Sequence, residues 1–399
     1  MKIIYLNWAS FGSEDVFDTI GRMREAGEDI TLIKYPFEKT DRRRDEAFEK
    51  KFSETLREER ADIVFSFNYF PVVAETVHAV YEECGTRYVS WVYDCPHIVL
   101  YSCTLVYPSN DVFLFDSAMY KTFALQGIET VHYLPLAANV RRLDAMQVTG
   151  EIWQKYQSRI SFVGAMYTEK GTFYDRMEKD LDPYAKGYLE GLMQAQMQVN
   201  GLNFIEEAIT PQIETYLQKA LPVPGNADGV ETAAWTYAQY FVNRKITQTE
   251  RALLLAAIGE RFPVVLYTHD KSFSAKGVQT RAAIDYYDTM PYVFKCSDIN
   301  LNITLRSITA GIPLRAFDIM GAGGFLLTSY QPDMDFFFTP GEDYVYYESK
   351  EDLLQKIDYY LTHESERKDI AANAREKIAG EHTFDARLRE ILDVVGAKR

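Results

Sequence analysis

The sequence has few cysteines and few basic side chains. Its four cysteines show neither C-x-x-C spacing nor the density of a disulfide framework, so we expect reduced thiols and no zinc site. Only 43 lysines and arginines face 58 aspartates and glutamates, a formal net charge of −15. Because neutralising phosphates needs a basic face, nucleic acid and anionic membrane surfaces are disfavoured as main partners. A local basic pocket is compatible with this balance.

Long apolar runs and export signals are also missing. The longest uncharged stretch, 95–110, contains two prolines and a histidine and is shorter than the ~20 residues of a membrane-spanning helix. The first residues lack a basic leader and a cleavage-like end before Glu14. We therefore expect a cytoplasmic protein without a membrane span.

Several common ligand-binding motifs are absent. No candidate strand is followed by G-x-G-x-x-G, and G-x-x-x-x-G-K-[ST] does not occur, which argues against a standard NAD enzyme and a P-loop NTPase. The G-x-S-x-G and H-E-x-x-H motifs are missing too, so the common hydrolases and metalloproteases are disfavoured.

What the sequence does contain is a regular alternation of short apolar strands with helices. In the first half, strands are expected at Lys2–Leu6, Ile30–Tyr35, Asp62–Phe67, Tyr88–Tyr93, Val112–Phe115 and Thr130–Leu134. Strands return at Ile160–Gly164, Phe262–Thr268, Asp298–Ile303, Gly324–Thr328 and Tyr344–Tyr347. Helices between the later strands are expected at Asp285–Cys296, Pro313–Gly321 and Glu351–Leu361. Such alternation predicts parallel sheets covered by helices on both faces.

The alternation is interrupted once, which suggests the domain organisation. We expect an α/β protein of two Rossmann-like domains, 1–150 and 151–380, facing each other across a cleft, with a helical insertion at about 175–260 in the second. A terminal helix should follow from Thr383. Open α/β sheets bind ligands outside the carboxyl ends of their strands, so the function should lie between the two domains.

The most informative segment runs from Ser297 to Thr328. Pro313 can begin a short helix, and Gly323-Gly324 can end it in left-handed geometry. The free N–H groups of that helix, with Arg306 or Arg315, suit a diphosphate. Asp318 could accept hydrogen bonds from two ribose hydroxyls. Equally, Arg315 and Asp318 could form a surface ion pair worth only ~0.2–0.5 kcal/mol.

Four stretches of the sequence resemble a known family. They are Asn300–Thr304, Gly311–Asp318, Gly323–Thr328 and His382–Arg387. They look like the carboxyl-terminal signature of the CgeB-like (spore maturation protein type) bacterial glycosyltransferases. Trp91–Pro96 is similar to part of the uncharacterised domain that often precedes that signature.

This resemblance implies a GT-B fold, in which the second domain holds a nucleotide-sugar donor, the first holds the acceptor, and helix 381–399 returns to the first domain. Gly164 and Lys170 look like the Gly-loop and Lys-Gly segment of related transferases, and UDP is the nucleotide expected by analogy. Retaining relatives typically carry a Glu-x7-Glu pair whose second member binds the ribose, whereas this sequence has Ala310 at the first position and the shorter Asp318 at the second. The donor-sugar contact and the stereochemistry therefore stay open.

The candidate site residues follow from these observations. On the donor side we predict Gly164, Lys170, His269, Asn302, Thr304, Arg306, Arg315, Asp318, Gly323 and Gly324. His269 follows a strand end, where a structural role is equally open. Gly12, after the first strand, is a candidate on the acceptor side, where it could permit close approach or simply form a turn.

Transfer from a nucleotide sugar builds negative charge on the leaving diphosphate, which cations, dipoles or a metal must offset. Because no acidic cluster stands beside the candidate phosphate segment, we predict no cofactor and metal-independent transfer, with Arg306, Arg315 and Lys170 supplying the charge. An inverting enzyme needs a base. Asp94 is the first candidate, although it could merely initiate a turn, and His97 is the second.

The predicted reaction is transfer of a sugar from a UDP-sugar to a protein, glycan or other cell-surface acceptor. Two alternatives stay open at this point. One is a non-catalytic two-lobed protein that closes on a small ligand, and the other is a nucleotide-sugar epimerase of similar build.

Overall fold

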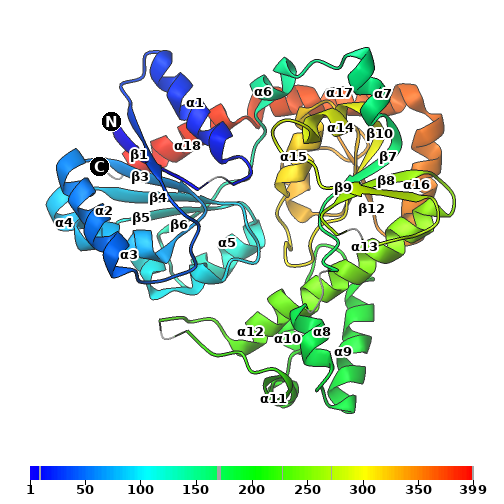
Figure 1. Cartoon of the computed structure of the whole chain (residues 1–399), viewed down its shortest axis with the longest axis horizontal. Helices are drawn as coiled ribbons and strands as arrows, with labels where there is room; N and C mark the ends of the chain where they lie inside the picture. Colours follow the sequence, from blue (N-terminus) through cyan, green and yellow to red (C-terminus); the bar gives the residue numbers. More distant parts are fainter. Residues whose placement is uncertain (9, 169–171, 227, 271, 398–399) are drawn as a thin grey trace. The chain divides into compact units, whose positions relative to one another are not determined.

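The computed structural model describes residues 1–8, 10–168, 172–226, 228–270 and 272–397 (Figure 1). The chain forms two compact units. The first comprises 1–136, 225–231 and 383–399, and the second comprises 137–224 and 232–382. The first unit ends before residue 150, the boundary expected from the sequence, because the chain beyond Leu136 packs against the second unit's own helices. A side chain at Gly321, for example, would meet Ala138 and Leu143.

The first unit is a six-stranded parallel sheet with the order β2-β1-β3-β4-β5-β6. Its strands are β1 (Lys2–Asn7), β2 (Thr31–Pro36), β3 (Ile63–Phe67), β4 (Arg87–Val92), β5 (Asn110–Leu114) and β6 (Val131–Tyr133). Its helices are α1 (Ser13–Glu25), α2 (Glu46–Glu59), α3 (Pro71–Ala79), α4 (Tyr81–Cys84), η1 (Ile98–Tyr101), η2 (Cys103–Val106) and α5 (Ser117–Ala124). The central strands β3, β4 and β5 are buried along their whole length, as is usual in a parallel sheet that helices cover on both faces.

The terminal helix α18 (Phe384–Gly396) belongs to this first unit and lies beside α1 (Figure 1). The Phe384 ring is 5.7 Å from the Trp91 ring, centre to centre, and Arg22 pairs with Asp385 at 3.3 Å. The Thr383 hydroxyl caps the helix by accepting the N–H of Ala386. The last part of the chain therefore completes the core begun by its first part.

The second unit is also a six-stranded parallel sheet, with the order β12-β11-β10-β7-β8-β9. The strands are β7 (Ser158–Val163), β8 (Val264–Thr268), β9 (Val278–Ala282), β10 (Ser297–Asn302), β11 (Leu326–Ser329) and β12 (Val345–Tyr347). The helices packed with them include α6 (Val140–Ala145), α7 (Gly150–Tyr156), α13 (Asn243–Gly259), α14 (Met290–Cys296), α15 (Leu314–Gly321), η4 (Pro332–Phe336), α16 (Lys350–Thr362) and α17 (Glu364–Glu381). The strand order reverses direction between β7 and β10.

The helical insertion has an apolar core of its own. It contains α8 (Phe173–Glu178), α9 (Pro183–Gln196), α10 (Ile205–Ala208), α11 (Pro211–Ala220), α12 (Ala233–Thr236) and the π-helical turn η3 (Tyr237–Val242), which continues into α13. Tyr174, Leu189, Leu217 and Tyr237 are among its buried members. The long helix α13 joins this cluster to the sheet, because its first residues pack in the insertion and its later residues pack in the sheet core.

These observations confirm the predicted fold class, two Rossmann-like α/β units with a helical insertion in the second. Several elements differ from expectation. The edge strand β9 and the helix α17 were not predicted, since the sequence of β9 is mostly polar and Ile370 and Ile378 are the only large apolar residues on the buried face of α17. The helix predicted at Asp285–Cys296 begins only at Met290. None of the helices that the structure describes combines the length and the apolar composition needed to cross a bilayer.

Candidate functional site

The candidate site lies at the carboxyl ends of β7 and β10, where the strand order of the second sheet reverses. Gly164 directly follows β7, and Asn302 ends β10. Loops that leave neighbouring strands in opposite directions open a crevice at such a switch point, and α/β sheets bind their ligands there. The topology therefore places the predicted donor-side residues where a ligand is expected.

Arg315, on the first turn of α15, reaches into this switch point. Its Nη1 donates a hydrogen bond to Asn302 Oδ1 at 2.9 Å, and its guanidinium carbon lies 5.4 Å from the centre of the Phe162 ring. A Cβ atom at Gly164 would stand only 2.9 Å from Arg315 Nη2. Glycine at position 164 thus makes room for this guanidinium, which remains partly accessible to solvent.

A second arginine, Arg251 of α13, lies beside Arg315. Its guanidinium donates to the carbonyls of Ile303 and Ala165 and lies 5.2 Å from the same Phe162 ring. Arg251 is 2% exposed. Burial lowers the pKa of both guanidinium groups, that of Arg315 to about 10, and the charge of Arg251 contributes to the shift of Arg315.

The two arginines form a cationic pair, and the carboxylates of Glu250 and Asp318 offset their charges only at a distance. In the described part of the chain, neither Arg251 nor Arg315 lies within ion-pair distance of a carboxylate, and the acceptors of their hydrogen bonds are the Ile303 and Ala165 carbonyls and Asn302 Oδ1. Burying two like charges side by side is unfavourable unless an anion compensates them. The arrangement can therefore bind an anion such as a diphosphate, for which the guanidinium fork is well suited.

Asn302 and Thr304 hold Arg315 in place. Asn302 Nδ2 donates to Thr304 Oγ1 at 3.0 Å and to Thr328 Oγ1 at 2.9 Å, which leaves Oδ1 to accept from Arg315. Both Asn302 and Thr304 are buried. Their role in this structure is to orient the arginine.

Asp318, one turn after Arg315 on α15, is 3% exposed. Its Oδ1 accepts a hydrogen bond from the Tyr286 hydroxyl at 3.2 Å. Burial of Asp318 does not fit the alternative of a simple surface ion pair with Arg315. A buried, oriented carboxylate close to a cationic pair is compatible with binding to ligand hydroxyls.

Gly323 and Gly324 shape the end of α15. Gly323 adopts a φ of +78°, as predicted for a residue that ends a helix in left-handed geometry. A Cβ at Gly324 would lie 2.7 Å from Asn300 Nδ2 and 2.8 Å from the Phe294 carbonyl. The backbone conformation therefore accounts for glycine at position 323, and close packing accounts for glycine at position 324.

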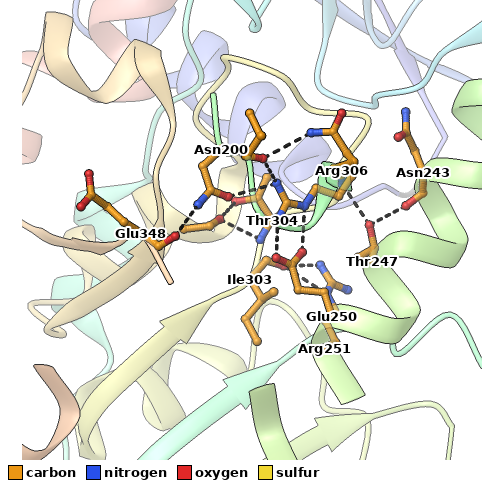
Figure 2. A network of polar contacts seen from close by, with 12 residues as sticks. Asn200, Asn243, Thr247, Glu250, Arg251, Ile303, Thr304, Arg306 and Glu348 are labelled. Carbon is orange, nitrogen blue, oxygen red and sulfur yellow. Dashed lines mark hydrogen bonds and ion pairs between the residues drawn. The ribbon is translucent and has the colours of Figure 1, made fainter. Parts of the chain in front are cut away.

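Arg306 points to protein acceptors in the structure (Figure 2). Its guanidinium binds both carboxylate oxygens of Glu250, the Val199 carbonyl at 2.7 Å and Asn200 Oδ1 at 3.0 Å. Its backbone N–H donates to Thr247 Oγ1 at 3.0 Å. These contacts join the loop after β10 to the insertion, so Arg306 serves to anchor α13 and is not among the residues that we assign to a diphosphate.

Two further donor-side candidates give less information. His269 follows β8 and is exposed, on the strand adjacent to β7. Lys170 lies outside the described residues. No three His, Cys, Asp or Glu side chains of the described residues gather in a way that could hold a metal ion.

In the first unit, Asp94 lies just beyond the carboxyl end of β4. Its Oδ2 accepts from Asn68 Nδ2 at 2.8 Å and from Lys39 Nζ at 3.5 Å, and its side chain is 37% exposed. Asn68 is fully buried with a φ of +96°, a costly conformation for a residue other than glycine. Asp94 is therefore both oriented by the fold and accessible.

His97 and Gly12 have structural surroundings. His97 is buried, its Nε2 lies 3.1 Å from the Tyr69 carbonyl, and burial lowers its pKa. Gly12 precedes α1 with a φ of +80°, and a Cβ there would lie 3.0 Å from the Phe67 ring. The turn and the close packing are sufficient reasons for this glycine.

Comparison with known proteins identifies the second part of the chain. A family model described as "Glycosyl transferase-like" matches residues 244–393. This segment is similar to glycosyltransferase domains. It starts within α13 and includes β8 to β12 as well as Arg251, Arg315 and Asp318. No curated protein matches the sequence.

Solved structures similar to this chain are glycosyltransferases with two Rossmann-like domains, the GT-B fold. A glycosyltransferase from Rickettsia africae has 14% identity and a TM-score of 0.54, over 99% of this chain and 98% of that one. HepE from Anabaena, in complex with UDP-glucose, has 9% identity and a TM-score of 0.55 over all of both chains. Sucrose-phosphate synthase from Thermosynechococcus elongatus has 10% identity and a TM-score of 0.54, also over all of both. At these identities the likeness concerns the fold.

Two residues of the segment that matches the family model were missed by the sequence analysis. Arg251 lies on α13, within the segment interpreted as an insertion, and no motif marked it. Tyr286 lies in an Asp-Tyr-Tyr-Asp cluster that is equally typical of a helix start. Arg251 and Tyr286 can be recognised as site residues only from the tertiary structure, in which β7, β10 and α15 come together.

Proposed function

We propose that this protein transfers a sugar from a UDP-sugar to an acceptor, and that the donor diphosphate binds at Arg315 and Arg251. The single observation that carries the proposal is this pair of guanidinium groups at the β7/β10 switch point, both over the Phe162 ring and both hydrogen-bonded to neutral oxygens. The segment that matches the glycosyltransferase family model contains both arginines and supports the same chemistry.

The reaction gives the two guanidinium groups a role. As the bond between sugar and phosphate breaks, positive charge develops on the sugar and negative charge on the leaving diphosphate. Arg315 can donate two parallel hydrogen bonds to phosphate oxygens, while the buried Arg251 adds positive potential behind it. Asp318 would accept from the ribose hydroxyls of the same donor.

The nucleotide, the acceptor and the subfamily belong to the proposal as well. UDP is favoured because HepE, of the same fold, was crystallised with UDP-glucose. We propose a glycan, protein or other cell-surface acceptor held by the first unit, with Asp94 as the base if the reaction inverts the anomeric centre. We assign the chain to the CgeB-like subfamily because four of its stretches resemble the signature of that subfamily. We propose a cytoplasmic location because its four cysteines are free thiols, as is usual in a reducing compartment.

Binding of UDP and UDP-glucose, measured by titration calorimetry, tests the donor site. Arg315→Gln should weaken UDP binding about 10- to 100-fold, because charged hydrogen bonds contribute about 1.5–3 kcal/mol. Arg261→Gln, which changes an exposed arginine of the same unit, is the matched control. The proposal fails if the wild-type protein binds no nucleotide sugar, or if Arg315→Gln binds UDP as tightly as the wild type.

Turnover with UDP-glucose and a mixture of acceptors tests the reaction class. We expect transfer that continues in the presence of EDTA, because the arginines offset the charge of the leaving group. Loss of transfer in EDTA that a divalent ion restores would contradict metal independence. Conversion of the donor without an acceptor would indicate an epimerase, and binding without turnover would indicate a non-catalytic protein.

A further inference from the structure

The hydrogen bond from the Tyr286 hydroxyl to Asp318 Oδ1 links the donor site to a turn that precedes α14. We propose that Tyr286 is a positioning residue that orients the Asp318 carboxylate toward the ribose of the donor. This inference rests on the proposed function, and it adds a residue to the nucleoside end of the site.

The turn that carries Tyr286 is held by its own hydrogen bonds. Asp285 Oδ1 accepts the N–H groups of Tyr287 and Asp288 at 2.8 and 2.7 Å. The Asp285 carbonyl accepts the N–H of Met290 at 2.8 Å. The backbone on both sides of Tyr286 therefore has a defined conformation before any ligand binds.

The Tyr286 ring is fixed from a second direction by Arg142 of α6. The guanidinium carbon of Arg142 lies 5.3 Å from the Tyr286 ring centre and 5.2 Å from that of Tyr287, within the range of cation–π attraction. Arg142 Nη1 also donates to the Tyr287 carbonyl at 3.3 Å. With the ring 5% exposed and held in this way, the hydroxyl points in one direction, to Asp318.

The length of the Asp318 side chain explains why such a residue is needed. Aspartate carries its carboxylate on a single methylene group, so the carboxylate of Asp318 stays close to the backbone of α15. A short buried carboxylate can bind two adjacent hydroxyls only in a suitable rotamer. A hydrogen bond to Oδ1 selects the rotamer, and it uses only part of the carboxylate's capacity, since the two oxygens offer about four acceptor positions.

The experiment compares UDP with 2′-deoxy-UDP by titration calorimetry in four proteins: the wild type, Tyr286→Phe, Tyr287→Phe and Asp318→Asn. The ratio of the two dissociation constants reports the contact with the ribose 2′-hydroxyl and is insensitive to a general loss of affinity. Tyr286→Phe keeps the ring on Arg142 and removes only the hydroxyl. Tyr287→Phe makes the same change on the neighbouring ring of the same arginine.

We expect the wild type to prefer UDP roughly tenfold, and Tyr286→Phe and Asp318→Asn to reduce this preference to about threefold or less. Tyr287→Phe should keep the wild-type preference, and thermal unfolding should show that all three variants fold. A Tyr286→Phe protein with the full preference would overturn the inference, while the donor site itself would stand. A wild type that binds UDP without preferring the ribose would also overturn it, and a wild type that does not bind UDP would overturn the proposed function.

Discussion

At the scale of single residues, the absence of a side chain at Gly164 is as important as the presence of Arg315. A Cβ atom at position 164 would lie 2.9 Å from Arg315 Nη2 and 3.2 Å from the Phe162 ring. Contacts this short force the neighbours to move. The Arg315 guanidinium is the end of a flexible side chain, which a hydrogen bond to Asn302 holds, so it is the group that would move.

We therefore expect Gly164→Ala to weaken UDP binding by about tenfold, the effect of losing one charged hydrogen bond, with little change in the thermal midpoint. Gly187→Ala is the matched control, because nothing lies within 4 Å of a Cβ there. Titration calorimetry with UDP checks the expectation. Unchanged affinity in Gly164→Ala would show that the close packing on Arg315 does not matter for binding.

His97 illustrates how burial at one residue couples stability to pH. Burial lowers the pKa of His97 below its ordinary value of 6.5, although the nearby Asp94 opposes the shift. The unfolded chain therefore takes up the proton first as the pH falls. Stability is complete above about pH 6.5 and is lost below it, by at most about 1.4 kcal/mol per pH unit for one group.

Urea unfolding from about pH 7.5 down to about pH 5.5 tests this coupling. We expect the wild type to lose more stability over this interval than His97→Gln, because glutamine does not titrate. If the two proteins lose the same amount, His97 does not contribute to the acid sensitivity of the fold.

At the scale of elements, α13 determines how the insertion and the donor site are joined. Two consecutive residues of this helix have different roles. Glu250 anchors the helix through its ion pair with Arg306, and Arg251 of the donor site donates a hydrogen bond to the Ile303 carbonyl. Figure 2 shows these contacts gathered at the loop that follows β10. The Glu250 and Arg306 side chains are only 11% and 10% exposed, so the pair is shielded from water.

Removing one partner of such a shielded pair leaves the other charge uncompensated. We expect Glu250→Ala to lower the free energy of unfolding by about 3–5 kcal/mol and to weaken UDP binding, because α13 also carries Arg251. Glu364→Ala breaks an exposed pair with Lys368 and should change stability by less than about 1 kcal/mol. Urea unfolding of both variants provides the measurement, and equal small effects would contradict an anchoring role for Glu250.

At the scale of the whole molecule, three separate segments of the chain form the first unit: 1–136, 225–231 and 383–399. The segment 225–231 adds a short antiparallel bridge between Ser102 and Gly229, and Arg43 pairs with Asp228 at 2.9 Å. The terminal helix buries Phe384, Leu388, Ile391 and Val395. The core of the first unit is thus completed by residues far apart in the sequence.

A chain that ends at His382 should therefore lose stability in the first unit while its second unit still binds UDP. The physical reason is that truncation exposes the apolar surface of α1 that α18 covers. Hydrogen exchange followed by mass spectrometry should show faster exchange in β1, β3 and β4 and unchanged exchange in β7 and β10. Equal protection of the first unit with and without α18 would contradict this expectation.

Much of the fold was predictable because local patterns encode it. Parallel strands contain short apolar segments even at a sheet edge such as β2, so the strands of the described residues could be located except the polar β9. The Pro313 to Gly324 segment was also recognised as a helix with a glycine end, since proline and glycine act through their own backbone conformations. The partners of Arg306 and Arg315 could not be predicted, because both residues lie in one short segment and look equivalent in the sequence.

By itself, the amino-acid sequence determined that this chain forms two parallel α/β units with a helical insertion. The reason is that the spacing of apolar residues and the residues that end helices and strands act over a few positions. Only the tertiary structure decided that Arg251 of α13 lies beside Arg315, that Glu250 forms an ion pair with Arg306, and that Tyr286 donates a hydrogen bond to Asp318. These side chains are separated by tens of positions or more, and they meet because of the order of the strands and the packing of the helices, which no local pattern records.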